Sequence, residues 1–263
     1  STGTSGVKAT SPLMLPARGR GMREGQRGSR SRTVAVMVGK SKGSKMERMT
    51  QIAEALETVK PTAQDALGDS VTFSPIRWKT GWPHHLRRVP PFRDDATASI
   101  TRSEVFAFGE DVRESGFARE QIIDFLGACF AYVAGQSNQV MQMQAFLRNK
   151  GNAAQLLAAV RKLDGVGAVD AYGALVATGL PPKFASAVAY FLAGEQEAGE
   201  ASKPVIICSN RARVAGLAKD ADWSAEEYGE YLTALASARD AYDASLPLDA
   251  VEWALREFAR RSE

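Results

Sequence analysis

The stretch LDGVGAVDA, residues Leu163–Ala171, decides how this chain is expected to fold. Gly165 and Gly167 lie two residues apart and allow a sharp backbone turn, so two helices can be joined by a tight hairpin. Ala171 follows Gly167 by about one helical turn, and its small side chain lets the second helix pack closely. The N–H groups of such a turn can bind phosphate. The simpler alternative is a helix that ends in a glycine cap.

Composition places the chain among ordinary folded proteins. Its 263 residues are 44% hydrophobic and 24% charged, which suffices for one large core or two modest ones. No apolar run approaches the roughly 20 residues that a membrane helix needs, and the N-terminus lacks the apolar core of a secretion signal. Cys129 and Cys208 are too few for a disulfide framework and are expected to be core residues. We therefore predict a cytoplasmic protein with no membrane contact.

No metal or cofactor site is predicted. His84 and His85 are adjacent, and no second pair of ligands lies nearby, which argues against zinc. Gly39 and the two residues after it resemble the end of a phosphate-binding P-loop, but Val34 occupies the place of the glycine that such a loop needs. This mismatch argues against nucleotide hydrolysis.

Positive charge is concentrated at the N-terminus. Residues 1–32 carry a net charge of +6, whereas the rest of the chain sums to −3. Affinity for DNA comes largely from neutralisation of phosphate by Lys and Arg, so the body alone is expected to grip a duplex weakly. We predict a disordered basic tail over residues 1–32 that adds nonspecific attraction, unless this Gly-, Ser- and Arg-rich leader is not native.

Hydrophobic periodicity predicts a mainly α protein with a short strand-and-helix appendage at residues 33–95. The appendage is expected to contain a strand at 33–38, a helix at 46–59 and a proline-rich loop over 71–95 with a short strand at its start. Residues 96–263 are expected to form one helical domain, whose first helix is capped by Thr101. Asp249 and Glu252 favour the start of its last helix through the helix dipole. The other helices are predicted at 117–133, 139–148, 152–163, 184–193, 224–244 and 248–260.

The proline-rich loop carries candidate nucleic-acid contacts. Trp78 and Trp82 are interleaved with basic residues that include Arg87 and Arg88. Such a combination can stack on a base and hold the DNA backbone. The alternative is that the two tryptophans pack onto the helical domain.

Residues 96–263 resemble the helix-hairpin-helix DNA glycosylase superfamily, and more narrowly the bacterial 8-oxoguanine DNA glycosylase-like proteins. The resemblance rests on the order of short motifs: ITRSEVF at 100–106, GLPPKFASAVAYFLAG at 179–194, KPVIICSNRARVAGL at 203–217, and YGEYLTAL followed by DAVEWAL. It implies a helical glycosylase-like fold and a DNA or modified-nucleobase ligand. With the hairpin and the loop, it nominates as nucleic-acid contacts Gly165, Gly167, Gly179, Lys183, Arg211, Trp78, Arg87 and Arg88.

The same resemblance implies a lysine that attacks the sugar to form a Schiff base and an aspartate that stabilises the developing cation. Aligned on Tyr190 and Phe191, the lysine position is Ala187, and the aspartate position is Cys208. Pro181 also replaces a glycine of the hairpin. We therefore predict a catalytically degenerate protein that binds nucleic acid or acts as a scaffold.

Several alternatives stay open. Lys183 lies one helical turn before Ala187 and can deliver an amine from a shifted position, which would make the chain an active 8-oxoguanine-type glycosylase and lyase. A water-activating acid, Asp164 or Asp170, is another route. Cys208 can act as a nucleophile if a following helix lowers its pKa, although a buried apolar role is simpler. A protein partner in a bacterial antiphage defence complex is the remaining alternative, because relatives resemble proteins of such gene clusters.

Overall fold

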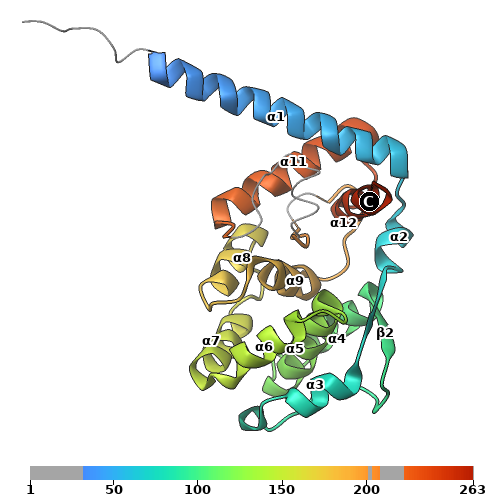
Figure 1. Cartoon of the computed structure of the whole chain (residues 1–263), viewed down its shortest axis with the longest axis vertical. Helices are drawn as coiled ribbons and strands as arrows, with labels where there is room; N and C mark the ends of the chain where they lie inside the picture. The colour runs from blue at the N-terminus through green and yellow to red at the C-terminus, as the bar shows by residue number, and fades with distance from the viewer. Residues whose placement is uncertain (1–31, 201–202, 208–221, 263) are drawn as a thin grey trace, which may run out of the picture. The chain divides into compact units, whose positions relative to one another are not determined.

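The computed structural model describes residues 32–200, 203–207 and 222–262. The chain divides into two compact units, residues 1–40 and residues 41–263. Of the first unit, residues 32–40 are described and are helical. The second unit is mainly helical with a small two-stranded sheet, which confirms the predicted mainly α class (Figure 1). None of the described helices is both long and apolar enough to cross a membrane.

The predicted N-terminal strand is wrong. Residues 33–38 belong to helix α1 (Arg32–Val59). The β-branched residues of this stretch lower helix propensity by only about 0.5 kcal/mol each, and extending a helix costs far less than starting one. The helix predicted at 46–59 is confirmed as the second part of α1. It ends where Lys60 adopts a φ of 52° and Pro61 follows.

Residues 60–101 contain more regular structure than the predicted loop. After α2 (Ala63–Leu67), strand β1 (Ser70–Phe73) pairs antiparallel with β2 (Ala98–Thr101). Between the strands lie α3 (Pro75–Gly81) and a 3-10 turn, η1 (His84–Leu86). The Ser74 side chain accepts a hydrogen bond from the Arg77 N–H, and Pro75 occupies the first turn of α3. This Ser–Pro start signal explains why the predicted loop is partly helical.

The helical body follows the predicted order. Thr101 caps α4 as expected: its side chain accepts from the Glu104 N–H, and the Glu104 carboxylate accepts from the Thr101 N–H at 2.7 Å. The helices are α4 (Arg102–Glu114), α5 (Arg119–Ala134), α6 (Gln139–Arg148), α7 (Lys150–Arg161), α8 (Ala168–Val176), α9 (Pro182–Ala193), α11 (Ala225–Asp243) and α12 (Leu248–Arg261).

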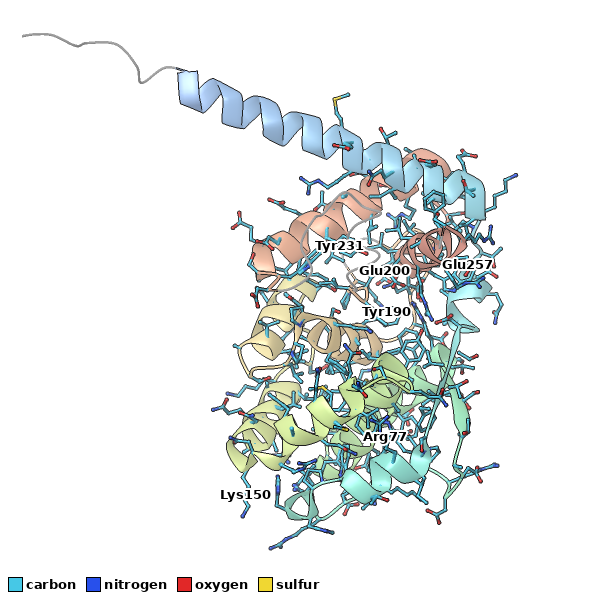
Figure 2. The ribbon with its side chains drawn as sticks, in the orientation of Figure 1. Arg77, Lys150, Tyr190, Glu200, Tyr231 and Glu257 are labelled. Carbon is cyan, nitrogen blue, oxygen red and sulfur yellow. The ribbon has the colours of Figure 1, made fainter. Side chains whose placement is uncertain are left out.

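One hydrophobic core joins these elements. Helix α5 is buried along most of its length and packs on α4 and α9, while α8 packs on α9 and α11, and α12 packs on α2 and α11. Ile52 of α1 and Trp78 of α3 belong to the same core. Figure 2 shows Tyr190 inside this body, whereas Lys150 lies exposed where α6 meets α7.

Candidate functional site

The glycine hairpin joins α7 to α8 at the surface. Its turn is closed by the Val166 N–H, which donates to the Leu163 carbonyl at 3.1 Å. Gly165 has a φ of 69°, a conformation that other residues rarely adopt. Gly167 has an ordinary φ of −64°, and no atom lies within 4 Å of where its Cβ would stand. Neither the backbone conformation nor packing among the described residues therefore requires glycine at 167.

A pocket of about 350 Å³ lies beside this hairpin. Residues 163–168 form one side, the end of α9 forms another, and Arg113 and Lys203 supply positive charge. Both cations also bind the protein: Arg113 donates to the Leu192 carbonyl at 2.6 Å, and Lys203 lies 3.4 Å from Glu200. The hairpin thus combines exposed backbone donors with nearby cations.

The hairpin between α8 and α9 is built differently. Gly179 has a φ of 95°, and a Cβ at this position would lie 3.2 Å from the Phe146 ring. Pro181 and Pro182, which follow, have no N–H to offer a phosphate. The first amide of the following helix that can donate is that of Lys183.

Lys183 is half-buried in the first turn of α9 and lines a pocket of about 210 Å³. Its Nζ lies 3.4 Å from Oε1 of Gln139. Ala187, one turn further along α9, is fully buried and does not line this pocket. The described residues that line the pocket besides Lys183 include no acid: Val71, Tyr132, Val133, Ala134, Gly135, Ile206 and Arg256.

Residues 203–207 are fixed against the helical body. The Ile207 N–H donates to Oγ of Ser186 on α9 at 2.9 Å, and the Tyr228 hydroxyl donates to the Val205 carbonyl at 2.8 Å. The first bond ties residues 203–207 to α9, the helix that carries Lys183, and the second ties them to α11. The predicted site residues Cys208 and Arg211 lie outside the described residues.

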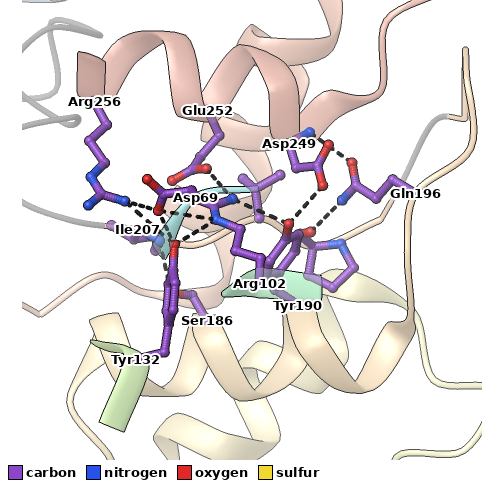
Figure 3. A network of polar contacts seen from close by, with 12 residues as sticks. Asp69, Arg102, Tyr132, Ser186, Tyr190, Gln196, Ile207, Asp249, Glu252 and Arg256 are labelled. Carbon is purple, nitrogen blue, oxygen red and sulfur yellow. Dashed lines mark hydrogen bonds and ion pairs between the residues drawn. The ribbon is translucent and has the colours of Figure 1, made fainter. Parts of the chain in front are cut away.

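A buried polar network adjoins the Lys183 pocket (Figure 3). Arg102, fully buried at the start of α4, donates to Glu252 at 2.9 Å and to the hydroxyls of Tyr132 at 2.8 Å and Tyr190 at 3.2 Å. Burial alone would lower the pKa of Arg102, but its interactions with Tyr132, Tyr190 and Asp69 outweigh burial and raise the pKa. The guanidinium therefore keeps its charge inside the protein.

Asp69 connects this network to the pocket. Its carboxylate accepts from the Tyr132 hydroxyl and from Nη1 of Arg256, and both donors line the Lys183 pocket. At the other end of the network, Asp249 accepts from the Tyr190 hydroxyl at 2.7 Å. Desolvation raises the pKa of Asp249, although Tyr190 and the charge of Arg102 oppose this.

Comparison with protein families shows to which family the chain belongs. A family model described as "Putative 8-oxoguanine DNA glycosylase OGG-like protein" matches residues 64–258. This chain belongs to that OGG-like family. Comparison with curated proteins and with solved structures finds no match. The matched range of the OGG-like chain includes both hairpins, Lys183, and the network from Asp69 to Arg256.

The polar network of this OGG-like protein was not predicted from the sequence. Asp249 and Glu252 were expected only to favour the start of the last helix, and no role was predicted for Asp69, Arg102 or Arg256. A signal was available, because Asp249, Glu252 and Arg256 are spaced by three and four residues and so share one face of α12. Charged residues on a face that also carries apolar residues indicate buried partners.

The candidate DNA contacts of the loop have different surroundings in the OGG-like chain. Trp78 is fully buried, with its ring centroid 6.3 Å from that of Trp82, so it has no exposed face on which a base can stack. Arg88 forms an ion pair with Asp124, which also raises the pKa of Arg88. Arg87 is exposed, with a φ of 54°.

Cys129 of the OGG-like chain is a core residue, as predicted. It is fully buried, and desolvation raises its pKa well above the ordinary value. A thiol that keeps its proton is a poor nucleophile. We therefore assign Cys129 a packing role.

Proposed function

We propose that this chain binds DNA and removes an oxidised base of the 8-oxoguanine type, with Lys183 as the amine that attacks the sugar. The observation that carries this proposal is the position of Lys183 at a pocket next to residues 203–207. Ala187, the position first aligned with the lysine of the family, is enclosed in the core instead. Lys183 is therefore a better candidate for the nucleophile position than Ala187, to which the alignment on Tyr190 and Phe191 points.

The chemistry needs a neutral amine. The Lys183 amine attacks C1′ of the sugar, the bond to the base breaks, and the base leaves with the bonding electron pair and takes up a proton. The amine loses its proton, and opening of the sugar ring gives an imine. Arg256 lines the same pocket, and Lys183 lies in the first turn of α9.

The glycine hairpin supports DNA binding beside this chemistry. Gly165 and Gly167 are exposed, and the turn presents backbone amides next to Arg113 and Lys203. Amides at the start of a helix favour anions such as phosphate. We assign this hairpin to the DNA backbone and the Lys183 pocket to the base and sugar.

A second candidate function is a DNA reader that releases no base. It is favoured by the absence of an acid among the described residues that line the Lys183 pocket. In the described part of the chain, Asp69 contacts two residues of the pocket but does not line it. A site that has no carboxylate near the sugar would stabilise the developing cation less.

Borohydride trapping on an oligonucleotide that contains 8-oxoguanine tests the proposal. We expect the wild type to form a covalent adduct with DNA and Lys183→Met to form none, because reduction fixes the imine between lysine and sugar. Lys150→Met is the matched control, since Lys150 is an exposed lysine at the opposite end of α7 from the glycine hairpin and should leave trapping unchanged.

A titration of the same oligonucleotide by fluorescence anisotropy, repeated at several salt concentrations, separates the two functions. Binding that weakens with salt, without an adduct or base release, would establish the reader and overturn the enzyme. Absence of both binding and adduct would overturn both functions.

A further inference from the structure

Arg256 occupies a distinctive place in the Lys183 pocket. It lies on α12, its side chain is 35% exposed, and it shares the pocket with Lys183 of α9. Its contacts with Asp69 and with the Tyr132 hydroxyl, the latter at 3.5 Å, all use Nη1. A guanidinium has five N–H donors and no acceptor. Among the described residues, no partner is recorded for Nε or Nη2 of Arg256, so donors remain for a ligand.

The pocket itself favours a flat ring over a phosphate. Val71, Val133 and Ile206 supply apolar walls, and the volume of about 210 Å³ suits one nucleobase, since a cavity of roughly 150 Å³ already holds benzene. Enzymes that act on a base commonly take it out of the stack and enclose it among such walls. The carboxylate of Asp69 partly neutralises Arg256, which makes the guanidinium better suited to a neutral oxygen than to a fully charged phosphate.

We propose that Arg256 reads the extruded base by donating hydrogen bonds to a ring carbonyl oxygen, so that the site selects 6-oxo purines over 6-amino purines. This inference rests on the proposed function of the Lys183 pocket and names the specificity of that pocket. A base with an amino group at this edge would place a donor against a donor and leave both groups unpaired once the base fills the pocket. Asp69 and Tyr132 act as positioning residues, because they hold Nη1 and thereby orient the guanidinium.

The test compares two modified bases in otherwise identical single-stranded oligonucleotides. 8-Oxoguanine has an oxygen at position 6, and 2,6-diamino-8-oxopurine has an amino group there. We expect the wild type to prefer 8-oxoguanine by about 10- to 100-fold in affinity, the range that one good base contact provides. In Arg256→Gln the preference should fall towards unity, because an amide can rotate to accept as well as donate.

A general loss of folded protein lowers both apparent affinities equally. Their ratio therefore still reports the preference when a variant is partly unfolded. Arg260→Gln on the same helix, where Arg260 is exposed and pairs with Glu257 at 2.5 Å, should keep the wild-type ratio. Equal affinity of the wild type for the two bases would overturn the inference. So would an Arg256→Gln variant that weakens both equally and lowers the salt dependence, since that pattern indicates a phosphate contact.

Measurement of base release on the same two oligonucleotides keeps this inference distinct from the proposed function. Preference for 8-oxoguanine in binding, lost in Arg256→Gln but unaccompanied by release or trapping, would support the role of Arg256 and overturn the glycosylase. Trapping of both bases at equal rates with equal affinities would support the glycosylase and overturn the role of Arg256.

Discussion

The two glycine-containing hairpins of this chain differ in their backbone amides and in the burial of the helix that follows each of them. The α7–α8 hairpin is exposed, keeps its backbone amides, and carries at Gly167 a glycine that the fold does not need. The α8–α9 hairpin has lost amides to Pro181 and Pro182, and leads into a helix buried along most of its length. The α7–α8 hairpin is suited to contact with a phosphate backbone, whereas the α8–α9 hairpin is suited to hold Lys183 rigidly.

The polar network holds α9, the helix that follows the α8–α9 hairpin, in place. Helix α9 is held through Tyr190, whose hydroxyl accepts from Arg102 and donates to Asp249. Helix α12, which carries Asp249 and Arg256, is thereby fixed to the helix that carries Lys183. The α7–α8 hairpin has no comparable buried charges among the described residues that surround it. The two hairpins should therefore respond differently to substitution.

The largest effect is expected at the buried ion pair. Glu252→Ala would leave Arg102 charged and buried without its closest carboxylate, and should lower the free energy of unfolding by about 3–5 kcal/mol. Glu257→Ala on the same helix removes surface pairs with Arg260 and Arg261, and should cost less than about 1 kcal/mol. Urea unfolding of both variants checks this. Similar losses would contradict a special role of the network in anchoring α9.

An intermediate effect is expected at the exposed hairpin. Gly165→Ala forces a φ of 69° on a residue with a Cβ and should destabilise the protein by about 1–2 kcal/mol. Gly167→Ala should leave stability unchanged or slightly improved, because φ is ordinary and the space is open. If this hairpin contacts DNA, Gly167→Ala should nevertheless weaken DNA binding several-fold.

Thermal unfolding and anisotropy titrations with an unmodified duplex measure these two properties separately. A Gly167→Ala variant with wild-type affinity for DNA would remove the hairpin from the DNA interface. Loss of stability in Gly167→Ala would show that glycine is needed there for folding after all.

The helical body could be predicted because its signals are local. Apolar spacing and caps such as Thr101 fix where helices begin and end, and α6 has its predicted bounds. The strand predicted at 33–38 failed because β-branched residues indicate strands only weakly when a helix can extend through them. For Trp78, the sequence allowed both stacking on DNA and packing, and only tertiary structure shows its burial.

The site was less predictable because its groups come from distant parts of the chain. Asp69 and Arg256 are 187 residues apart in sequence, and Arg102 and Glu252 are 150 apart. No local pattern records such a pairing. The alignment on Tyr190 and Phe191 directed attention to Ala187, whereas burial and the pocket favour Lys183.

The smallest effect is expected from the acid that ends the network. Burial raises the pKa of Asp249 in the folded protein, so between the unfolded value of about 4 and the folded value the native state binds more protons. The free energy of unfolding should therefore fall as pH rises through this window. Asp249→Asn removes the titration but keeps an acceptor for Tyr190, so its stability should fall less over the same range.

Asp243 is the matched control with the opposite sign. Hydrogen bonds from Ser245 lower its pKa, so Asp243 contributes stability above the unfolded pKa that is lost as pH falls through the folded value. Asp243→Asn should therefore reduce the loss of stability as pH falls below the unfolded pKa, whereas Asp249→Asn should reduce the loss of stability as pH rises above it. Urea unfolding at a series of pH values distinguishes the two. Parallel profiles for Asp249→Asn and the wild type would contradict a raised pKa of Asp249 in the folded protein.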